Sequence, residues 1–492
     1  MKQKKCSKRI FFFAVVLLWL FTAAVGMEAV ARLIAARRLE AAQRVAAQLY
    51  SARETVYWNQ KTLARFADTP PATGTDFEAR LAFLAGEEEV RRQYIADRGD
   101  LVLLLSAERV LAQLYGPSAD AAPEIRHMAE QLRPGLCLTA VLPRQLHYDV
   151  EQALNATFAG QRQMRDYPMP QPDGAEYVMQ FVFMPMPDTA SRTAAAAVFI
   201  RPSMWQVLWF SFKPNIHQND MFDFRTNAQG FRDEEICVPK PPGRFRIVCF
   251  GGSSTAEGPT NQLTYPKMLD AMLKDRYGED RIEVLNCGIF AILSQNEAER
   301  FQDIIALEPD LIVYYNFVND LLLLFEAFPA WGRRLRQSAF VYNHLNPLLL
   351  PGDHELEQAI RRATLDNLQH MHDLADAAGV PMAFCSFAAP DFFNIPPDER
   401  AFFDKHINGM AWGRKINMRS YLRITDTYNR LLKAQCREWG ALYIPTAETL
   451  TGGAAMFTDI CHLHLWGIER KAVIVFEHLV PWLNLHLPLA KW

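Results

Sequence analysis

The chain has 492 residues, of which 50% are hydrophobic and 22% charged, and its formal net charge is −3. This length predicts two or three folded units, and the balance of apolar and charged residues excludes a largely disordered chain. A charge this close to neutral gives no support for nucleic acid as a partner. The eight cysteines are scattered singly, without the paired spacing of a zinc site, so no metal cluster is expected.

The first element in chain order is an apolar segment that follows a basic amino terminus. Lysines and arginines within residues 2–9 precede an uncharged run from Ile10 to Met27. At a helical rise of about 1.5 Å per residue, this run nearly crosses the ~30 Å hydrocarbon core of a bilayer. Residues 1–27 therefore predict an uncleaved signal anchor with the rest of the chain exported. A cleavable signal peptide ending near Ala29-Val30-Ala31 is the alternative.

Residues 28–95 predict a helical stalk. Strong helix formers dominate this stretch, and its apolar residues recur at i, i+3 and i+4, as in RRLEAAQRVAAQLY. The adjacent prolines Pro70 and Pro71 interrupt the helical pattern.

Residues 96–202 predict a small α+β domain. An opening strand, DLVLLLS, is followed by helical segments near 120–132 and 145–160, and then by the paired strands YVMQFVFMPMP and AAAAVFIRP. This order resembles a PAS-type sensor domain, and a structural spacer is the alternative. Residues 203–240 are rich in aromatic, turn and proline residues and predict a linker.

Residues 241–492 predict an α/β domain. Five short apolar runs alternate with amphipathic helical stretches; the runs are FRIVCF, IEVLN, LIVYY, VPMAFCSF and ALYIP. Continuous apolar strands alternating with helices indicate a five-stranded parallel sheet covered on both faces, a three-layer α/β/α arrangement. In such sheets ligands bind beyond the carboxyl ends of the strands.

Polar residues that could take part in catalysis follow three of these strands. Ser253 lies on a glycine turn after FRIVCF, at the junction of strand and helix, where a serine nucleophile is exposed and close to backbone N–H donors. Asp459 precedes His462 by three residues on one loop, so its carboxylate can orient the imidazole. Asn319 follows LIVYY and offers an amide to a developing oxyanion.

Together these segments resemble the SGNH hydrolases, also called the GDSL esterase and lipase family, over about residues 240–485. FGGSST, VLNCGIFAILS, NFVND and FTDICHLHLWGIERKA match the four blocks of the family in order. The stretch NAQGFR is similar to the segment shortly before the first strand in membrane-anchored bacterial members of the family. That resemblance implies a single-pass protein of the bacterial inner membrane whose catalytic domain faces the periplasm.

The resemblance also implies roles for particular residues. Ser253 would attack the acyl carbonyl, His462 would act as base and Asp459 would fix the imidazole, with no metal or organic cofactor. The backbone N–H of Ser253, the amide of Asn319 and an N–H of the second block would hold the oxyanion. Ala291 replaces the usual glycine of that block, with Gly288 as the alternative donor.

Two further residues bear on the pocket. Phe317 stands where the family usually has glycine, so its ring is expected near the acyl group, where it would restrict acyl size. His464 is expected to line the pocket or to pack; reading it with Asp459 and His462 as metal ligands is a rival interpretation.

The expected substrate is an acyl ester on a glycan or lipid, with short acyl esters such as O-acetyl groups on envelope glycans following from the exported location and Phe317. An O-acyltransferase using the same site is one alternative function. A sensor or scaffold protein with an inactive hydrolase fold is another.

Overall fold

The computed structural model describes residues 2–51, 76–86, 88–98, 100–117, 123–140, 142–170, 176–186, 195–219, 223–328, 330–409 and 415–487. The chain divides into two compact units. One unit comprises Met1–Pro70, Cys237–Gly258 and Gln262–Trp492, and the other comprises Pro71–Ile236 with Pro259–Asn261. The predicted stalk, 28–95, is therefore shared between the two units.

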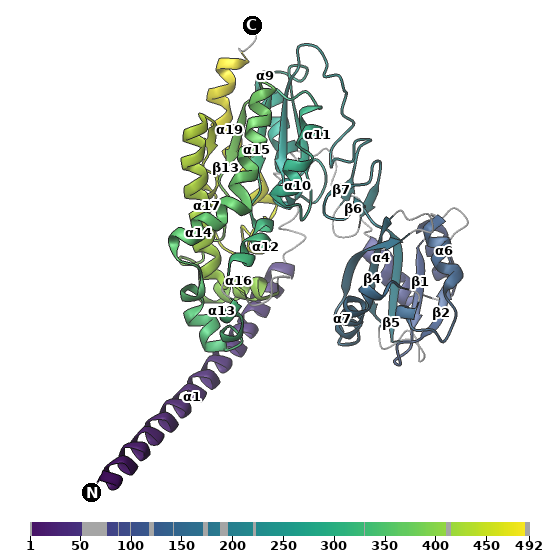
Figure 1. The fold of residues 1–492 in the computed structure, drawn as a ribbon. Coiled ribbons are helices and arrows are strands. Elements are labelled where there is room, and N and C mark those ends of the chain that lie inside the picture. Colours follow the sequence, from purple (N-terminus) through teal and green to yellow (C-terminus); the bar gives the residue numbers. More distant parts are fainter. Residues whose placement is uncertain are drawn as a thin grey trace. The chain divides into compact units, whose positions relative to one another are not determined.

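Helix α1, Lys2–Ser51, begins the first unit as one continuous helix (Figure 1). Its partly buried carboxylate Glu28 accepts hydrogen bonds from Ser338 Oγ at 2.6 Å and from the backbone N–H of Ala339 at 3.0 Å. In the part of the chain searched, no helix was found that is both long and apolar enough to span a bilayer. Most side chains of the predicted anchor, those of residues 1–15, 17, 18 and 20, lie outside the described residues.

The second unit is built on an antiparallel sheet with the order β2-β1-β5-β4-β3. The strands are β1 Leu101–Leu105, β2 Leu111–Tyr115, β3 Gln163–Pro170, β4 Glu176–Pro185 and β5 Ala196–Pro202. The helices are α4 Asp76–Ala85, α5 Glu88–Arg98, α6 Pro123–Gln131 and α7 His147–Phe158. The strands β2 and β3 were missed from the sequence because β2 carries the polar Gln113 at its centre and β3 contains two prolines, which only an edge strand tolerates.

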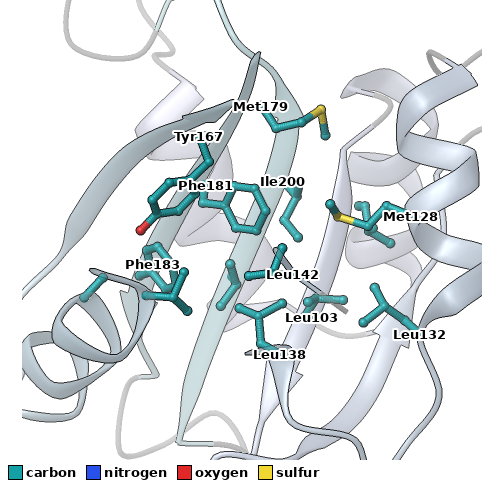
Figure 2. Close-up of a cluster of buried hydrophobic side chains, with 14 of the residues drawn as sticks. Leu103, Met128, Leu132, Leu138, Leu142, Tyr167, Met179, Phe181, Phe183 and Ile200 are labelled. Atoms are coloured by element: carbon teal, nitrogen blue, oxygen red, sulfur yellow. The ribbon is translucent and has the colours of Figure 1, made fainter. Parts of the chain in front are cut away.

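Both faces of this sheet are covered, which explains why β1 is apolar at every position. Leu101, Leu103 and Leu105 pack on the face that also receives α6 and α7, and Figure 2 shows this core. Val102 and Leu104 point to the opposite face, where they meet Phe83, Leu84, Tyr94 and Ile95 of α4 and α5. Residues 76–98 thus belong to the sheet domain rather than to a stalk. The PAS-type resemblance of this domain stays a prediction.

The predicted linker, 203–240, contains regular structure. It forms two short antiparallel pairs, β6 Trp205–Val207 with β7 Ser211–Phe212, and β8 His217–Asn219 with β9 Asp223–Arg225. The ring of Trp205 lies 4.8 Å from that of Phe212, and Phe212 packs edge-on against Phe224. Aromatic packing therefore orders a stretch whose turn residues and prolines indicated a linker.

The first unit contains a parallel sheet with the order β11-β10-β12-β13-β14, and all five strands lie at the predicted apolar runs. They are β10 Phe245–Gly251, β11 Ile282–Gly288, β12 Leu311–Tyr315, β13 Met382–Cys385 and β14 Leu442–Ile444. The strand order reverses at β10, which has β11 on one side and β12 on the other. In doubly wound sheets this switch point opens a crevice at the carboxyl ends of the strands.

Helices form a layer on each face of this sheet (Figure 1). α9 Tyr265–Tyr277 packs with α19 Leu465–His486, whereas α10 Ser294–Glu299 and α11 Phe301–Ile305 pack with α15 Asp366–Ala377. The remaining helices are α8 Ser253–Ala256, α12 Leu321–Leu324, α13 Ala330–Leu335, α14 Asp353–Ile360, α16 Pro397–Gly409, α17 Met418–Trp439 and α18 Thr446–Thr449, with short 3₁₀ and π segments between them. The three-layer α/β/α arrangement predicted for residues 241–492 is present.

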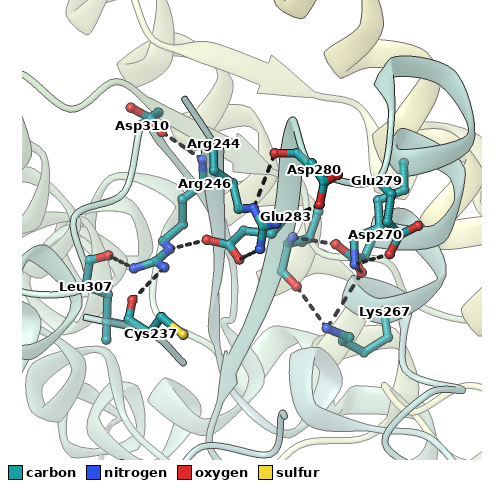
Figure 3. A network of polar contacts seen from close by, with 12 residues as sticks. Cys237, Arg244, Arg246, Lys267, Asp270, Glu279, Asp280, Glu283, Leu307 and Asp310 are labelled. Carbon is teal, nitrogen blue, oxygen red and sulfur yellow. Dashed lines mark hydrogen bonds and ion pairs between the residues drawn. The ribbon is translucent and has the colours of Figure 1, made fainter. Parts of the chain in front are cut away.

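A polar network closes the amino-terminal edge of the parallel sheet (Figure 3). The fully buried Arg246 donates to Glu283 at 2.7 Å and to the carbonyl oxygen of Cys237 at 2.8 Å, while its backbone N–H donates to Asp310 at 2.7 Å. Asp270 accepts from the N–H of Val284 at 2.6 Å. Because these charges are paired and lie opposite the carboxyl edge, they are structural.

Glycine is required where the carboxyl ends of β10, β11 and β12 meet. Gly251 has φ +156°, and a Cβ atom there would lie 2.1 Å from the carbonyl oxygen of Tyr315 on β12. A Cβ at Gly288 on β11 would lie 2.5 Å from the backbone nitrogen of Ala256. These close approaches let the turn after β10 sit tightly against its neighbouring strands.

We predict that Gly251→Ala strongly destabilises the protein, whereas Gly243→Ala has a smaller effect. Gly243 also has positive φ, at +78°, but nothing lies within 4 Å of its added Cβ. It therefore reports the backbone cost alone, about 1–2 kcal/mol. Gly251→Ala adds a collision with backbone, worth about 1–3 kcal/mol more by the general cost of overpacking. Urea unfolding of the full chain measures both, and equal losses would contradict the close approach.

Candidate functional site

Ser253 lies at the carboxyl edge of the parallel sheet. It is the first residue of α8, two positions after the last residue of β10. A Cβ on the preceding Gly252 would lie 2.5 Å from Asn316 Oδ1, so the turn has no room for a side chain there. The strand, the tight turn and the short helix together place one hydroxyl group at the carboxyl edge of the sheet, at the switch point where ligands bind in sheets of this kind.

A histidine and an aspartate from a loop more than 200 residues away complete a relay with this serine. His462 Nε2 lies 2.8 Å from Ser253 Oγ, and His462 Nδ1 lies 2.7 Å from Asp459 Oδ2. The other oxygen of Asp459 accepts from the backbone N–H groups of Cys461 and His462, both at 2.8 Å. The carboxylate is thereby fixed on the loop, and it holds the imidazole with one nitrogen toward the serine.

The charges of this pair shift both pKa values. Burial by itself lowers the pKa of His462, but the Asp459 carboxylate outweighs burial and raises it well above its ordinary value. Burial likewise raises the pKa of Asp459, but His462 and the two loop N–H groups outweigh it and hold this pKa well below its ordinary range. The aspartate therefore remains ionised and stabilises a protonated imidazole.

The groups expected at the site differ in exposure from their neighbours. Ser253, Asn319 and His462 are partly exposed, and Ala291 is exposed. The adjoining Ser254, Gly288, Asp320 and Cys461 are all buried. A substrate can thus reach the relay, while the residues that support it are shielded from water.

Two backbone N–H groups are available as anion donors at this edge. Within the described part of the chain, neither Ser253 nor Ala291 donates its N–H to another protein group. Ala291 has φ +55°, the left-handed conformation that explains why glycine is usual at this position in the family it resembles. The N–H of Gly288 donates instead to Asn286 Oδ1 at 3.1 Å, so the alternative donor at Gly288 is not available.

One carbonyl oxygen orients two amides beside Ala291. The oxygen of Ile292 accepts from Asn319 Nδ2 at 3.0 Å and from Asn316 Nδ2 at 3.1 Å. An amide group carries two N–H donors, so Asn319 keeps one hydrogen after this contact. Asn316 is buried and also donates to Glu297 at 3.0 Å, so it supports the loop and does not face the site.

Two buried acids support this loop from behind, and the sequence did not reveal their roles. The side chain of Asp320 does not cap the helix that follows it; it accepts from the N–H of Ser294 at 2.8 Å and from Thr364 Oγ1 at 2.7 Å. Burial raises the pKa of Asp320 to about 6 and that of Glu297 to about 8. All their partners are distant in the chain, so the residues near Asp320 and Glu297 in the sequence could not predict these contacts.

The structure corrects the pocket role expected for Phe317, and of the two roles expected for His464 it favours packing. The Phe317 ring is only 2% exposed and stacks on Tyr428 of α17, with centroids 4.0 Å apart and planes 8° apart. It also meets Phe387 edge-on at 5.9 Å, so it fills the core between β12 and α17. His464 is buried at the amino-terminal end of α19. Neither side chain supports a limit on acyl size.

The donor set near His462 does not favour a metal ion. Asp459, Cys461 and His462 bring ligand atoms within 4.8 Å of one another, and His464 is not part of this group. Both ring nitrogens of His462 already make contacts, with Ser253 and Asp459. Burial raises the pKa of the Cys461 thiol to about 12, which disfavours the thiolate that binds metals.

A buried ion pair joins the two halves of the relay. Glu257 and Lys471 are both buried, and Lys471 Nζ lies 2.7 Å from Glu257 Oε1. The other oxygen of Glu257 accepts from the N–H of Leu463, next to His462, at 2.8 Å. Lys471 Nζ also donates to the carbonyl oxygen of Ser254, next to the serine. Sequence reasoning missed this pair because its members lie 214 residues apart.

Comparisons with known proteins found solved structures that match about half of the chain. A putative G-D-S-L lipolytic protein from Desulfitobacterium hafniense matches with 12% identity and a TM-score of 0.31, covering 48% of this chain and 100% of that one. A GDSL-like lipase from Bacteroides thetaiotaomicron matches with 15% identity and a TM-score of 0.31, covering 51% and 93%. An acetyl-xylooligosaccharide esterase variant from Geobacillus matches with 18% identity and a TM-score of 0.31, covering 48% and 94%.

The likeness to GDSL proteins expected from the sequence is thus found among solved structures. No family model matches the chain, and no curated protein matches it. At such low identities and TM-scores, the chemistry of this chain has to be argued from its own side-chain geometry.

We predict that Lys471→Met lowers the free energy of unfolding by about 3–5 kcal/mol, because it leaves the Glu257 carboxylate buried without its partner. The double variant Glu257→Gln/Lys471→Met should lose less than the sum of the single variants. Urea unfolding of the full chain measures each loss.

The control is Lys433→Met, which breaks an exposed pair with Glu448 at 3.3 Å. Exposed pairs contribute about 0–1 kcal/mol, so this variant should stay close to the wild type. Similar losses for Lys471→Met and Lys433→Met would show that the buried pair does not support the site.

Proposed function

We propose that the protein is a serine esterase that cleaves acyl esters through an acyl-Ser253 intermediate. The observation that carries this proposal is the continuous relay from Ser253 Oγ through His462 to Asp459, with contacts of 2.8 and 2.7 Å. Hydrogen-bonded contact between a hydroxyl, an imidazole and an ionised carboxylate is the arrangement that activates serine for acyl transfer.

The proposed reaction proceeds in two steps. In the first, Ser253 Oγ attacks the acyl carbonyl carbon while His462 Nε2 takes the hydroxyl proton and Asp459 stabilises the imidazolium. His462 then gives this proton to the leaving alcohol, and the acyl group stays on Ser253. In the second step His462 takes a proton from water while the water oxygen attacks the acyl carbon. His462 then gives this proton to Ser253 Oγ as the bond between serine and the acyl group breaks, and the free acid leaves.

The oxyanion formed in each step needs donors on the side of the carbonyl oxygen. The N–H groups of Ser253 and Ala291 and the remaining amide hydrogen of Asn319 are the donors that we propose. The bond from Asn319 to the oxygen of Ile292 holds that amide in place, so little reorganisation is needed when the charge develops.

We propose further that the apolar run at residues 10–27 tethers the enzyme to the bacterial inner membrane with its site on the periplasmic side. The basic residues before this run and its lack of charge support the proposal. An exported position makes O-acetyl groups and other short acyl esters of envelope glycans the proposed substrates. Release of free acetate without a sugar acceptor distinguishes hydrolysis from transfer to a sugar hydroxyl.

The direct test is labelling of the full chain by a fluorophosphonate, which traps activated serines. Wild-type protein should label on Ser253, Ser253→Ala should not label, and His462→Ala should label about 10²–10⁴ times more slowly because the general base is gone. Ser254→Ala is the matched control, since its hydroxyl is buried and makes no hydrogen bond among the described residues. Absence of labelling in folded wild-type protein would refute the esterase proposal.

The pH dependence of labelling provides a second test. His462 must be neutral to accept the serine proton, so the rate should fall as the pH drops through its pKa. Since Asp459 raises that pKa, the midpoint should lie above the ordinary value of 6.5. In Asp459→Asn the midpoint should move to lower pH and the plateau should fall. An unchanged midpoint in this variant would mean that Asp459 does not act on His462.

A further inference from the structure

The carboxyl-terminal half of α1 contacts the rest of the first unit at two places. At the first, Glu28 accepts from Ser338, from the N–H groups of Ala339 and Phe340, and from Arg32. These contacts, led by the Ser338 hydroxyl, lower the pKa of Glu28 to about 2. At the second, the buried residues Ala41 and Ala42 pack against Ala401 of α16. The part of the helix from Glu28 to Ala42 is therefore held against the rest of the unit, and the space beside it belongs to the fold.

A basic cavity of about 690 Å³ lies between α1 and α16. Its lining includes five arginines and two aspartates, which gives three excess positive charges. Three of the arginines come from α1, namely Arg37, Arg38 and Arg44, and the others are Arg400 and Arg419. A cavity with this charge favours an anionic ligand.

The ion pairs inside the cavity leave part of this charge without a carboxylate in direct contact, although Asp404 also acts on Arg400 and Arg419 at longer range. Arg38 lies 3.6 Å from Asp404, and Arg44 lies 3.5 Å from Asp398. Among the described residues, Arg37, Arg400 and Arg419 have no ion-pair partner within 4 Å. Arg419 lies over the ring of Phe393 instead, at 5.6 Å. Guanidinium groups bind phosphate oxygens through paired N–H donors, so the three are suited to a phosphate.

An apolar cavity of about 320 Å³ adjoins the basic one on the amino-terminal side. It is lined by Met27, Val30 and other small or apolar residues of α1, together with Phe340. Ile34 and His344 line both cavities, so the two are continuous along the helix. From Met27 to Arg37 the helix rises by about 15 Å, a length suited to a headgroup and the first part of an acyl chain.

We propose that the two cavities form one binding site for an anionic amphiphile, a lipid with a phosphate in its headgroup. The phosphate would lie among Arg37, Arg400 and Arg419, and the acyl chain would follow α1 from Ile34 toward Met27. A soluble anion would use only the basic part, and a neutral chain only the apolar part. The site does not include Ser253, Asp459 or His462, so this proposal can be tested separately from the esterase proposal.

The test is native mass spectrometry of the full chain released from neutral-detergent micelles, with dioleoyl phosphatidic acid, dioleoyl phosphatidylcholine or inorganic phosphate added. We expect one retained phosphatidic acid, bound at least tenfold more tightly than either other probe. Equal retention of the two lipids would overturn the proposal. Inorganic phosphate binding as tightly as phosphatidic acid would show a simple anion site and would also overturn it.

Variants separate the two parts of the site. Arg37→Gln/Arg400→Gln should weaken phosphatidic acid binding at least tenfold, and Ile34→Asn should weaken it without creating phosphate binding. The control Arg361→Gln/Arg362→Gln removes the same charge from two exposed arginines outside the cavity and should change binding less than twofold. A urea unfolding midpoint equal to that of the wild type in every variant shows that the unit is folded, whether or not the esterase proposal holds. Unchanged binding in Arg37→Gln/Arg400→Gln would overturn the proposal.

Discussion

The buried pair of Glu257 and Lys471 is the interaction on which the site depends. Ser253 begins a helix of only four residues, and His462 lies on an irregular loop, so neither segment is rigid by itself. The pair contacts a backbone group next to each of them, the carbonyl oxygen of Ser254 and the N–H of Leu463. Two charges in a low-dielectric interior hold their geometry firmly because separating them is costly. The ion pair thereby fixes the positions of Ser253 and His462, whose side chains form the hydrogen bond of the relay.

Charged groups are divided between the two edges of the parallel sheet. At the amino-terminal edge the guanidinium of Arg246 pairs with Glu283, and the backbone N–H of Arg246 donates to Asp310. At the carboxyl edge the acids Asp320 and Glu297 are buried behind the loops, while the hydroxyl, imidazole and amide of the site remain partly exposed. The same sheet thus has one edge that stabilises the fold and one edge at which chemistry is feasible, as expected where the strand order reverses.

Helix α16 connects the catalytic loop region to α1. On one side Glu399 accepts from the N–H of Ala454, at the start of the segment that leads to Asp459 and His462, at 2.7 Å. On the other side Ala401 packs against α1, where Asp398 and Arg400 line the basic cavity. The helix that walls the proposed lipid site is therefore also a support of the catalytic loop.

The sequence by itself determined the parallel sheet and the pairing of Asp459 with His462, whereas the meeting of Ser253 with His462 was predicted only through the resemblance to a family. Five short apolar runs that alternate with amphipathic stretches indicated strands buried on both faces, and each of them is a strand in the structure. The spacing of three residues between Asp459 and His462 is local, so one loop suffices to bring their side chains together.

Tertiary structure alone decided which distant side chains meet around the site. Phe317 is covered by Tyr428, the N–H of Gly288 is engaged by Asn286, and Lys471 meets Glu257. Two of these depend on residues more than a hundred positions apart, and the third on the side-chain conformation of a buried asparagine. Hydrophobic periodicity and motif spacing report what a residue and its near neighbours prefer, and they carry no record of which distant side chain will fill the space beside it.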